Sequence, residues 1–282
     1  MPITSFADEG QTIDKNILTE EATGKGVKVA VIDSGIASHP DLNIAGGYNL
    51  IDDSEAYGDD NGHGTMVAGI IAGKAYGVAP DVELYALKVL NQNGKGYPYD
   101  VVNAVLWSIE HDMDIINLSV SFRDDYEPLN RVIQRAIEKG IIVIASAGNS
   151  GNEVSIPASI DGVISVGGLN SDMQTKASFS PTKGRIDYYA KATDIYSTNR
   201  YGSYEGRWYG NSFSAPYVTG IFALYKEAFP NATAEELKEM VYADSIVNSN
   251  GYRIPQKPTY ERQGYLQLYS ENGKLKANHV DR

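Results

Sequence analysis

The sequence of 282 residues contains no cysteine. Disulfide bonds, a thiolate nucleophile and cysteine-ligated zinc are therefore excluded. The sequence also lacks an apolar run of about 18–20 residues, so we expect no membrane-spanning helix and no membrane partner. Positive charge is scarce, because 24 Lys and Arg stand against 36 Asp and Glu, which gives a net charge of −12. A chain this acidic, without a local basic patch, is repelled by phosphate backbones, and we expect no nucleic-acid partner.

The first 26 residues are polar and lack the apolar stretch of a secretion signal. We therefore expect a cytoplasmic protein if Met1 is the native start, and an extracellular one if the chain is a trimmed mature form. Hydrophobic residues make up 42% of the sequence and charged residues 21%, which is typical of a globular domain. No linker-like stretch divides the chain. We predict one domain over residues 1–282, with an N-terminal arm at 1–23, a core at 24–269 and a C-terminal tail at 270–282.

Apolar runs rich in β-branched residues predict buried strands at 27–32, 84–90, 115–120, 141–145 and 163–166. Apolar residues at helical spacing predict helices at 65–72, 99–111, 129–139, 212–229 and 233–241. Strands that alternate with helices indicate an α/β fold, namely a doubly wound, mostly parallel sheet with helices on both faces. Because such sheets bind ligands at the carboxyl ends of their strands, polar residues at strand-to-helix transitions are the candidate functional residues.

Two such residues occupy the first half of the chain. Asp33 ends a predicted strand and precedes Gly35, which lets the chain turn; taken alone, it is equally well explained as a turn aspartate. His63 lies between Gly62 and Gly64 at the start of a predicted helix, where other backbone can approach closely. A histidine here suits a general base at neutral pH, although single histidines are commonly surface or structural residues.

Two more candidates lie in the second half. Ser212 opens the long apolar helix, where serine is commonly an N-cap. The same position suits a nucleophile whose developing charge benefits from the helix dipole. Asn149 stands in a glycine-rich turn after a predicted strand, either as a left-handed turn residue or as an amide that donates to an oxyanion.

The four residues lie in the motifs VIDSGI, NGHGT, SAGN and GNSFSAP. In this order, and each at a strand-to-helix transition, these motifs resemble those of the subtilisin-like serine proteases, or subtilases. The order Asp, His, Ser is the one established for subtilisin itself. The resemblance runs from about residue 24 to about residue 269. It implies a subtilisin-like α/β fold and a serine endopeptidase that hydrolyses peptide bonds through an acyl-enzyme.

The resemblance also implies a role for each residue. Ser212 would attack the scissile carbonyl, and His63 would take the serine proton and later pass it to the leaving amine. Asp33 would orient His63 and stabilise its charged form. Asn149 would donate to the oxyanion together with the backbone N–H of Ser212. No cofactor enters this chemistry.

The serine motif departs from the usual family sequence Gly-Thr-Ser-Met-Ala, since Asn211 and Phe213 flank Ser212. In the family, the threonine hydroxyl assists the oxyanion site. Asn211, through its amide, is therefore a second candidate oxyanion donor. The same departure is the one feature that supports an alternative function, a non-catalytic peptide-binding protein on this fold. The presence of Asp33, His63 and Ser212 together argues against that alternative.

A further set of residues matches the family's substrate-binding positions. They are Lys95, Gly96 and Tyr97 on the edge strand that pairs with the substrate backbone, Ser119, Val120 and Ser121 along the wall of the pocket for the residue before the cleaved bond (S1), Ser155 in its floor, and Ala147 and Gly148. The family usually has Leu-Gly-Gly where this chain has Val120, Ser121 and Phe122, and glycine where it has Ser155. Both changes add side-chain atoms to the S1 pocket, so we expect this pocket to be narrower and more polar than in the family.

Asp41 is a lone match to a ligand of the family's tight calcium site. The segment 72–78 is shorter than in secreted relatives and lacks the loop that wraps the ion. One carboxylate falls short of the 6–8 oxygens that calcium takes, so we expect no tight structural calcium site. Five acidic residues precede His63, and we expect a solvated loop there, with a weak calcium site or a preference for basic substrates as alternatives: Asp52, Asp53, Glu55, Asp59 and Asp60.

The expected partner is a polypeptide substrate, with a dedicated precursor or processing substrate as the narrower hypothesis. The first 23 residues are too short for the usual folded inhibitory pro-segment, but such an arm, or an inhibitor, can lie across the cleft. We expect a monomer.

Overall fold

The computed structural model describes residues 21–258, and Ala22–Pro258 form one compact unit. Most of the predicted N-terminal arm (1–20), the end of the predicted core (259–269) and the predicted tail (270–282) lie outside the described residues.

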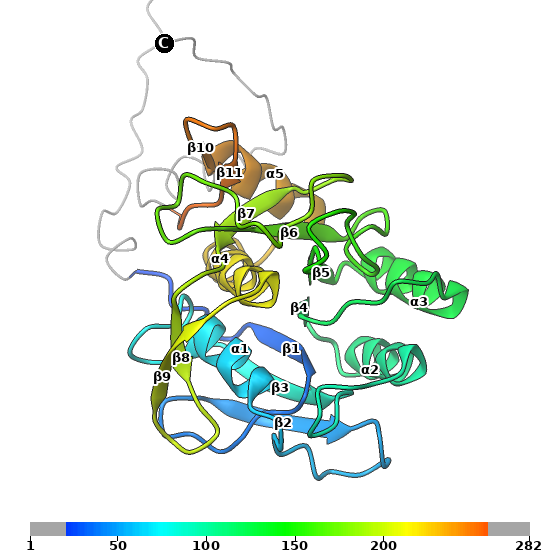
Figure 1. The fold of residues 1–282 in the computed structure, drawn as a ribbon. Coiled ribbons are helices and arrows are strands. Elements are labelled where there is room, and N and C mark those ends of the chain that lie inside the picture. The colour runs from blue at the N-terminus through cyan, green and yellow to red at the C-terminus, as the bar shows by residue number, and fades with distance from the viewer. Residues whose placement is uncertain (1–20, 259–282) are drawn as a thin grey trace, which may run out of the picture. The chain divides into compact units, whose positions relative to one another are not determined.

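A seven-stranded sheet forms the centre of this unit (Figure 1). Its strands lie in the order β2-β3-β1-β4-β5-β6-β7 and every neighbouring pair is parallel. Their bounds are β1 Lys28–Asp33, β2 Ile44–Asn49, β3 Glu83–Lys88, β4 Ile115–Leu118, β5 Ile142–Ser146, β6 Ile164–Leu169 and β7 Tyr188–Lys191. The order reverses direction around β1, which is the topology of a doubly wound sheet.

Helices cover both faces of the sheet (Figure 1). The helices α1 (His63–Ala72) and α4 (Ser214–Ala228) pack together on one face, and α2 (Pro98–Glu110) and α3 (Glu127–Glu138) pack together on the other. The helix α5 (Ala234–Asp244) contacts α4. The predicted doubly wound α/β fold is confirmed, and each predicted strand and helix of the core is present within a few residues of its expected bounds.

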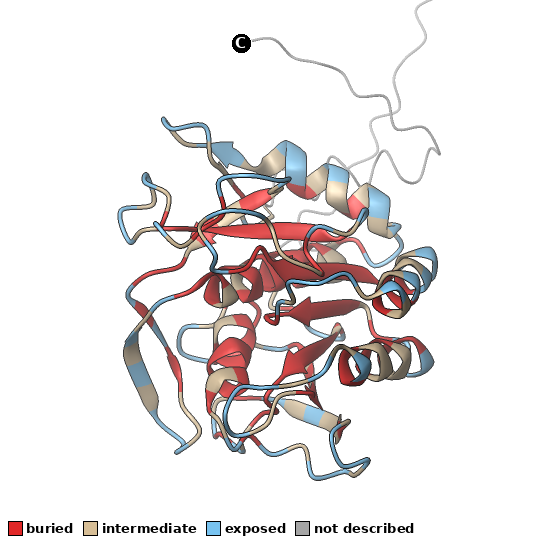
Figure 2. Cartoon of the chain, turned by 45° about the vertical axis from the view of Figure 1, so that its right-hand side comes forward, coloured by how far each residue is buried: buried red, intermediate tan, exposed pale blue. Residues whose placement is uncertain are grey.

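The core consists of β-strand and helix side chains that exclude water from both faces of the sheet (Figure 2). All residues of β4, β5 and β6 are buried. Leu118, Leu129 and Ile133 are among the largest side chains that are fully buried, and each contributes roughly 1.5–3 kcal/mol through removal of apolar surface from water. This rigid sheet holds the carboxyl end of β1 in place.

Several elements were not predicted because their sequences lack apolar periodicity. The edge strand β2 contains Gly46 and Gly47, and β7 is short. The hairpin β8 (Ile195–Thr198) and β9 (Tyr204–Trp208) is rich in polar and tyrosine residues, and the strands of the small pair β10 (Ile246–Val247) and β11 (Arg253–Ile254) are only two residues long.

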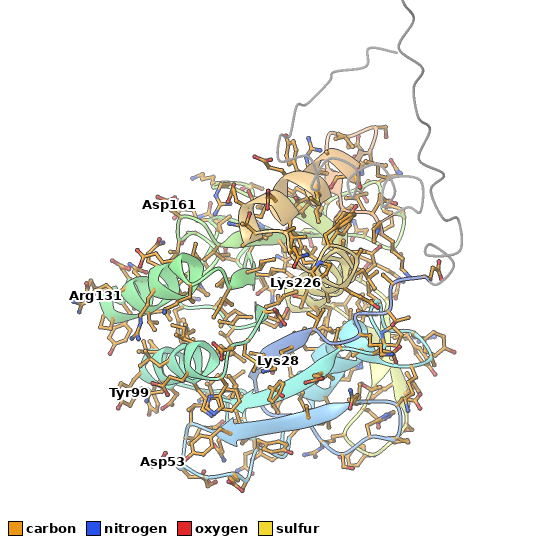
Figure 3. All side chains as sticks on the ribbon, turned by 180° about the vertical axis from the view of Figure 1, so that it is seen from behind. Lys28, Asp53, Tyr99, Arg131, Asp161 and Lys226 are labelled. Atoms are coloured by element: carbon orange, nitrogen blue, oxygen red, sulfur yellow. The ribbon has the colours of Figure 1, made fainter. Side chains whose placement is uncertain are left out.

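Ser212 was predicted to be the first residue of the long apolar helix, but the observed helix begins two residues later. Ser212 belongs to a short 3₁₀ turn, Asn211–Phe213, and α4 begins only at Ser214. On the outer surface, Tyr99 of α2 and Arg131 of α3 point away from the sheet (Figure 3). In the described part of the chain, no helix has the length and apolar character that crossing a bilayer requires.

Candidate active site

Asp33 and His63 form the centre of the site. Asp33 is the last residue of β1 and is fully buried, whereas His63 is the first residue of α1 and keeps a quarter of its side chain exposed. The Nδ1 atom of His63 lies 2.8 Å from Oδ1 and 2.9 Å from Oδ2 of Asp33. With Nδ1 donating to the carboxylate, Nε2 carries the lone pair that a general base needs.

The close approach of β1 and α1 requires a glycine at position 64. A β-carbon there would collide with the carbonyl oxygen of Gly35 and touch the side chain of Asp33. The glycine next to the candidate histidine therefore serves the packing that brings His63 to Asp33, as the motif suggested.

The charge of Asp33 also changes the acidity of His63. Burial lowers the pKa of the imidazole, but the charge of Asp33, its hydrogen bond and the charge of Asp59 together raise it above its ordinary value. The net effect favours the imidazolium form that arises when the ring accepts a proton.

The hydroxyl of Ser212 is directed to the backbone. Its Oγ donates to the carbonyl oxygen of Ser119, 3.3 Å away, and its own carbonyl oxygen accepts from Ser119 Oγ at 2.9 Å. The next residue, Phe213, lies against His63 with 5.4 Å between ring centroids. Phe213 is buried in a small apolar cluster with Met66 and Ile195. The contact between Phe213 and His63 was not predicted.

Asn149 and Asn211 are linked by a hydrogen bond. The backbone N–H of Asn211 donates to Oδ1 of the exposed Asn149 side chain at 2.8 Å, which leaves the Asn149 Nδ2 group as a donor without a protein partner among the described residues. The role of Asn211 as a second oxyanion donor stays a prediction, and the position of its side chain speaks against it. Its side chain is fully buried, its Nδ2 donates to the carbonyl oxygen of Gly148, and its Oδ1 has no hydrogen-bond partner among the described residues.

A cleft of about 620 Å³ runs past His63. Its lining includes six of the predicted substrate-binding residues: Lys95, Gly96, Tyr97, Ser119, Val120 and Ser121. Residues 95–97 form one side of the cleft and residues 119–121 the other. The backbone groups of Gly96 make no hydrogen bond within the described part of the chain, so they are available to an extended peptide.

Ala147, Gly148 and Ser155 do not line this cleft but lie together behind it. Ala147 is buried, and its carbonyl oxygen accepts from the N–H of Ser155 at 3.0 Å. The Ser155 side chain lies against the backbone of Gly148, in the space that a β-carbon on residue 148 would take. Phe122, which does line the cleft, exchanges two backbone hydrogen bonds with Ile156.

The acidic loop before His63 is largely exposed, as predicted, except at Asp59. Asp59 is only 9% exposed and Asp60 pairs with the buried Lys88, whose Nζ lies 2.6 Å from Asp60 Oδ1. The other four acidic residues of the loop are exposed: Asp52, Asp53, Glu55 and Asp60. The loop therefore has a structural connection to the site that its composition did not reveal.

Asp41, the lone match to a ligand of the family's calcium site, is bonded to a tyrosine. The hydroxyl of Tyr204 donates to Asp41 Oδ2 at 2.5 Å, so the carboxylate already has a partner. Tyr204 in turn contacts the rings of His39, Tyr76 and Tyr196. Burial and the bond to Asp41 raise the pKa of Tyr204 to about 12. Across residues 21–258, no three Asp, Glu or His side chains gather as ligands of a metal ion would.

The structure brings Asp33 and His63 together at the carboxyl edge of a doubly wound sheet, and Phe213, the residue after Ser212, contacts His63. The sequence model of the subtilase family matches residues 24–268, and the chain belongs to this family. It is therefore a member of a family of serine endopeptidases.

Individual relatives support the same family assignment. The chain is 41% identical over 224 residues to the minor extracellular protease Epr of Bacillus subtilis (strain 168), covering 77% of this chain and 34% of that protein. It is 40% identical over 246 residues to a thermostable alkaline protease of Halalkalibacterium halodurans, covering 84% and 65% respectively. The chain thus spans less than two thirds of these relatives.

A solved structure shares the fold. The crystal structure of a cold adapted subtilisin-like serine proteinase superposes with a TM-score of 0.80 at 27% identity, covering 89% of this chain and 96% of that one.

Proposed function

We propose that this chain is a serine endopeptidase in which Asp33, His63 and Ser212 form the catalytic triad. The observation that carries the proposal is the bond of His63 Nδ1 to both carboxylate oxygens of a fully buried Asp33. A carboxylate in that position fixes the tautomer in which Nε2 accepts a proton, and it stabilises the imidazolium that follows.

The proposed reaction begins when the Ser212 hydroxyl turns from the Ser119 carbonyl toward His63 Nε2. Oγ attacks the scissile carbonyl carbon while its proton passes to Nε2, and the carbonyl oxygen becomes an oxyanion held by the Asn149 amide and the Ser212 N–H. The tetrahedral intermediate collapses, the C–N bond breaks, and His63 gives the proton to the leaving amine. Water then attacks the acyl-enzyme by the same proton transfers, which releases the acid product and restores Ser212.

The proposed substrate is an extended polypeptide that lies as a strand between residues 95–97 and 119–121. The free backbone groups of Gly96 support pairing on one side. A β-carbon at position 96 would collide with the carbonyl oxygen of Val89, so glycine here permits the segment to lie close to the sheet. Strand addition of this kind obtains affinity from the backbone and leaves side-chain selection to pockets.

We further propose that the S1 pocket is narrow and polar, which favours small side chains and a dedicated precursor or processing substrate. Phe122 supports the narrow shape, because it lines the cleft with a side chain where the family usually has glycine, and Ser155, which lies against Gly148 behind that lining, adds the polar hydroxyl. Peptide libraries varied at the residue before the cleaved bond test it. Preference for small or polar residues is expected, and a preference for large aromatic residues would contradict the proposal.

The alternative, a non-catalytic peptide binder, rests on the departure of Asn211 and Phe213 from the usual serine motif, and the bond between His63 and Asp33 argues against it. Its experimental signature is peptide affinity without turnover. Cleavage of casein by wild-type protein, lost in Ser212→Ala, excludes it. We propose that the working unit is a monomer, that it uses no cofactor, and that neither nucleic acid nor membrane is a partner.

A further inference from the structure

Ser34, the residue after Asp33, is fully buried and uses every one of its polar atoms. Its N–H donates to Asp33 Oδ1 at 2.7 Å, and its carbonyl oxygen accepts from Lys88 Nζ at 2.8 Å. Its hydroxyl accepts from the N–H of Gly64 at 2.9 Å and donates to Asp59 Oδ1 at 2.9 Å. Ser34 therefore joins the strand that carries Asp33 to the helix that begins at His63.

Asp59 is the second residue that connects β1 to the start of α1. Its Oδ1 accepts from Ser34 Oγ and from the N–H groups of Asn61 at 3.0 Å and Gly62 at 2.7 Å. Its Oδ2 accepts from the N–H of Thr65 at 2.9 Å and from Thr65 Oγ1 at 2.6 Å. Five donors on one carboxylate that is 9% exposed make a rigid anchor.

The start of α1 explains why this anchor is needed. The first N–H groups of a helix lack partners inside the helix, and a side chain at the N-cap position commonly satisfies one of them. Here the N-cap is Gly62, which has no side chain. Ser34 Oγ accepts from the second residue of the helix, Gly64, and Asp59 accepts from the third, Thr65. The cap is thus supplied from outside the helix and is tied to β1.

We propose that Ser34 and Asp59 are positioning residues, which fix the separation and angle between the Asp33 carboxylate and the His63 ring and thereby set the rate of the chemical step. This inference rests on the proposed triad. Neither residue lies in the lining of the cleft beside His63, so both act through Asp33 and His63. A misplacement of about 1 Å in such a pair costs about 10²-fold in rate.

The charge of Asp59 provides an independent readout, because it is one of the causes that raise the pKa of His63. The other charged groups at this end of α1 are Asp33 on β1, the Lys88–Asp60 pair and Arg200, whose guanidinium donates to the Asp60 carbonyl oxygen. The turn Asn211–Phe213 and α4 present no charged side chain to the ring. The acid limb of kcat/KM should therefore move to lower pH when Asp59 loses its charge.

The test compares Ser34→Ala and Asp59→Asn with two matched controls remote from the site. Ser108 is a fully buried serine that bonds within α2, and Asp114 is a half-buried carboxylate that accepts from the Lys28 N–H at the opposite edge of the sheet, so Ser108→Ala and Asp114→Asn report the loss of a comparable hydrogen-bonded group. A chromogenic peptide gives kcat and KM, and titration with a fluorophosphonate gives the number of active sites.

We expect kcat per active site to fall about tenfold to a hundredfold in Ser34→Ala and Asp59→Asn with KM within about twofold, which is the signature of a lost transition-state interaction. The acid limb of kcat/KM should move to lower pH in Asp59→Asn, and the two control variants should leave both kcat and the position of this limb unchanged. Values of kcat in Ser34→Ala that match Ser108→Ala would overturn the proposal. Failure of both site variants to fold would overturn it too, because the pair would then be structural. Ser212→Ala separates the two hypotheses, since activity that survives this change contradicts the triad itself.

Discussion

The side chain of Ser155 lies against the backbone of Gly148, in the space that a β-carbon on residue 148 would occupy. Gly148 has a φ of 87°, so its neighbours in the SAGN motif are held by a left-handed turn. The carbonyl oxygen of Gly148 also accepts from Asn211 next to Ser212. The contact therefore places the Ser155 hydroxyl beside the turn that leads to Asn149, the proposed oxyanion donor.

Ser155→Gly should widen the S1 pocket. Removing the hydroxymethyl group frees space next to Gly148, so kcat/KM for a peptide with phenylalanine before the cleaved bond should rise relative to alanine by about tenfold, within the range of about 10–200-fold that one methylene-sized group provides. Paired chromogenic peptides measure this ratio. The variant Ser159→Gly, on the same segment but away from Gly148, is the control. An unchanged ratio in Ser155→Gly contradicts the proposed role of this side chain.

Asn149→Ala should remove a transition-state hydrogen bond. As is known for the oxyanion-donating asparagine of subtilisin, the expected loss is about 10²–10³-fold in kcat. KM should change little, because the bond forms to the oxyanion and not to the ground-state carbonyl. Steady-state kinetics on a chromogenic peptide check this. Asn152→Ala, in the neighbouring exposed turn, serves as the control, and a rise in KM with constant kcat would contradict the assignment.

The rate should fall at acid pH as His63 becomes charged. The base form of His63 is needed for attack, and the pKa of its imidazole is raised by Asp33 against the opposing effect of burial. The acid limb of kcat/KM should therefore lie above the ordinary histidine pKa of about 6.5. Asp33→Asn should move that limb to lower pH and reduce kcat by about 10⁴-fold through loss of the correct tautomer. A limb that stays in place in Asp33→Asn would show that another group titrates.

Stability should not depend on calcium at Asp41. Because the Asp41 carboxylate is bound by Tyr204, we propose that chelators leave the melting temperature unchanged. Tyr204→Phe should lower the stability by about 1.5–3 kcal/mol, since a hydrogen bond to a charged group is lost. Thermal unfolding with and without EDTA measures both effects, with Tyr201→Phe on the exposed end of the hairpin as the control. A large fall in melting temperature on chelation would indicate a calcium site that we have not identified.

Much of the site could be predicted because it depends on local sequence. The apolar run before Asp33, the glycines around His63 and the turn that holds Asn149 specify strand ends and helix starts, and a parallel sheet brings these ends to one edge. Pairings between distant residues were not predictable. The burial of Asp59 depends on donors from Ser34 and Thr65, and composition alone indicated a solvated loop. The inward orientation of the Asn211 side chain was not predictable for the same reason, because its acceptor, the carbonyl oxygen of Gly148, belongs to a distant segment of the chain.

The central claim is that Ser212 is a nucleophile activated by His63 and Asp33, and labelling with a fluorophosphonate probe tests it most directly. Wild-type protein and Ser212→Ala are treated with the probe, and casein cleavage is followed in parallel. Labelling of the wild type that is lost in Ser212→Ala is the predicted result, and labelling without casein cleavage would add support for a selective S1 pocket. Folded wild-type protein that takes up no probe would contradict the account and favour the peptide-binding alternative.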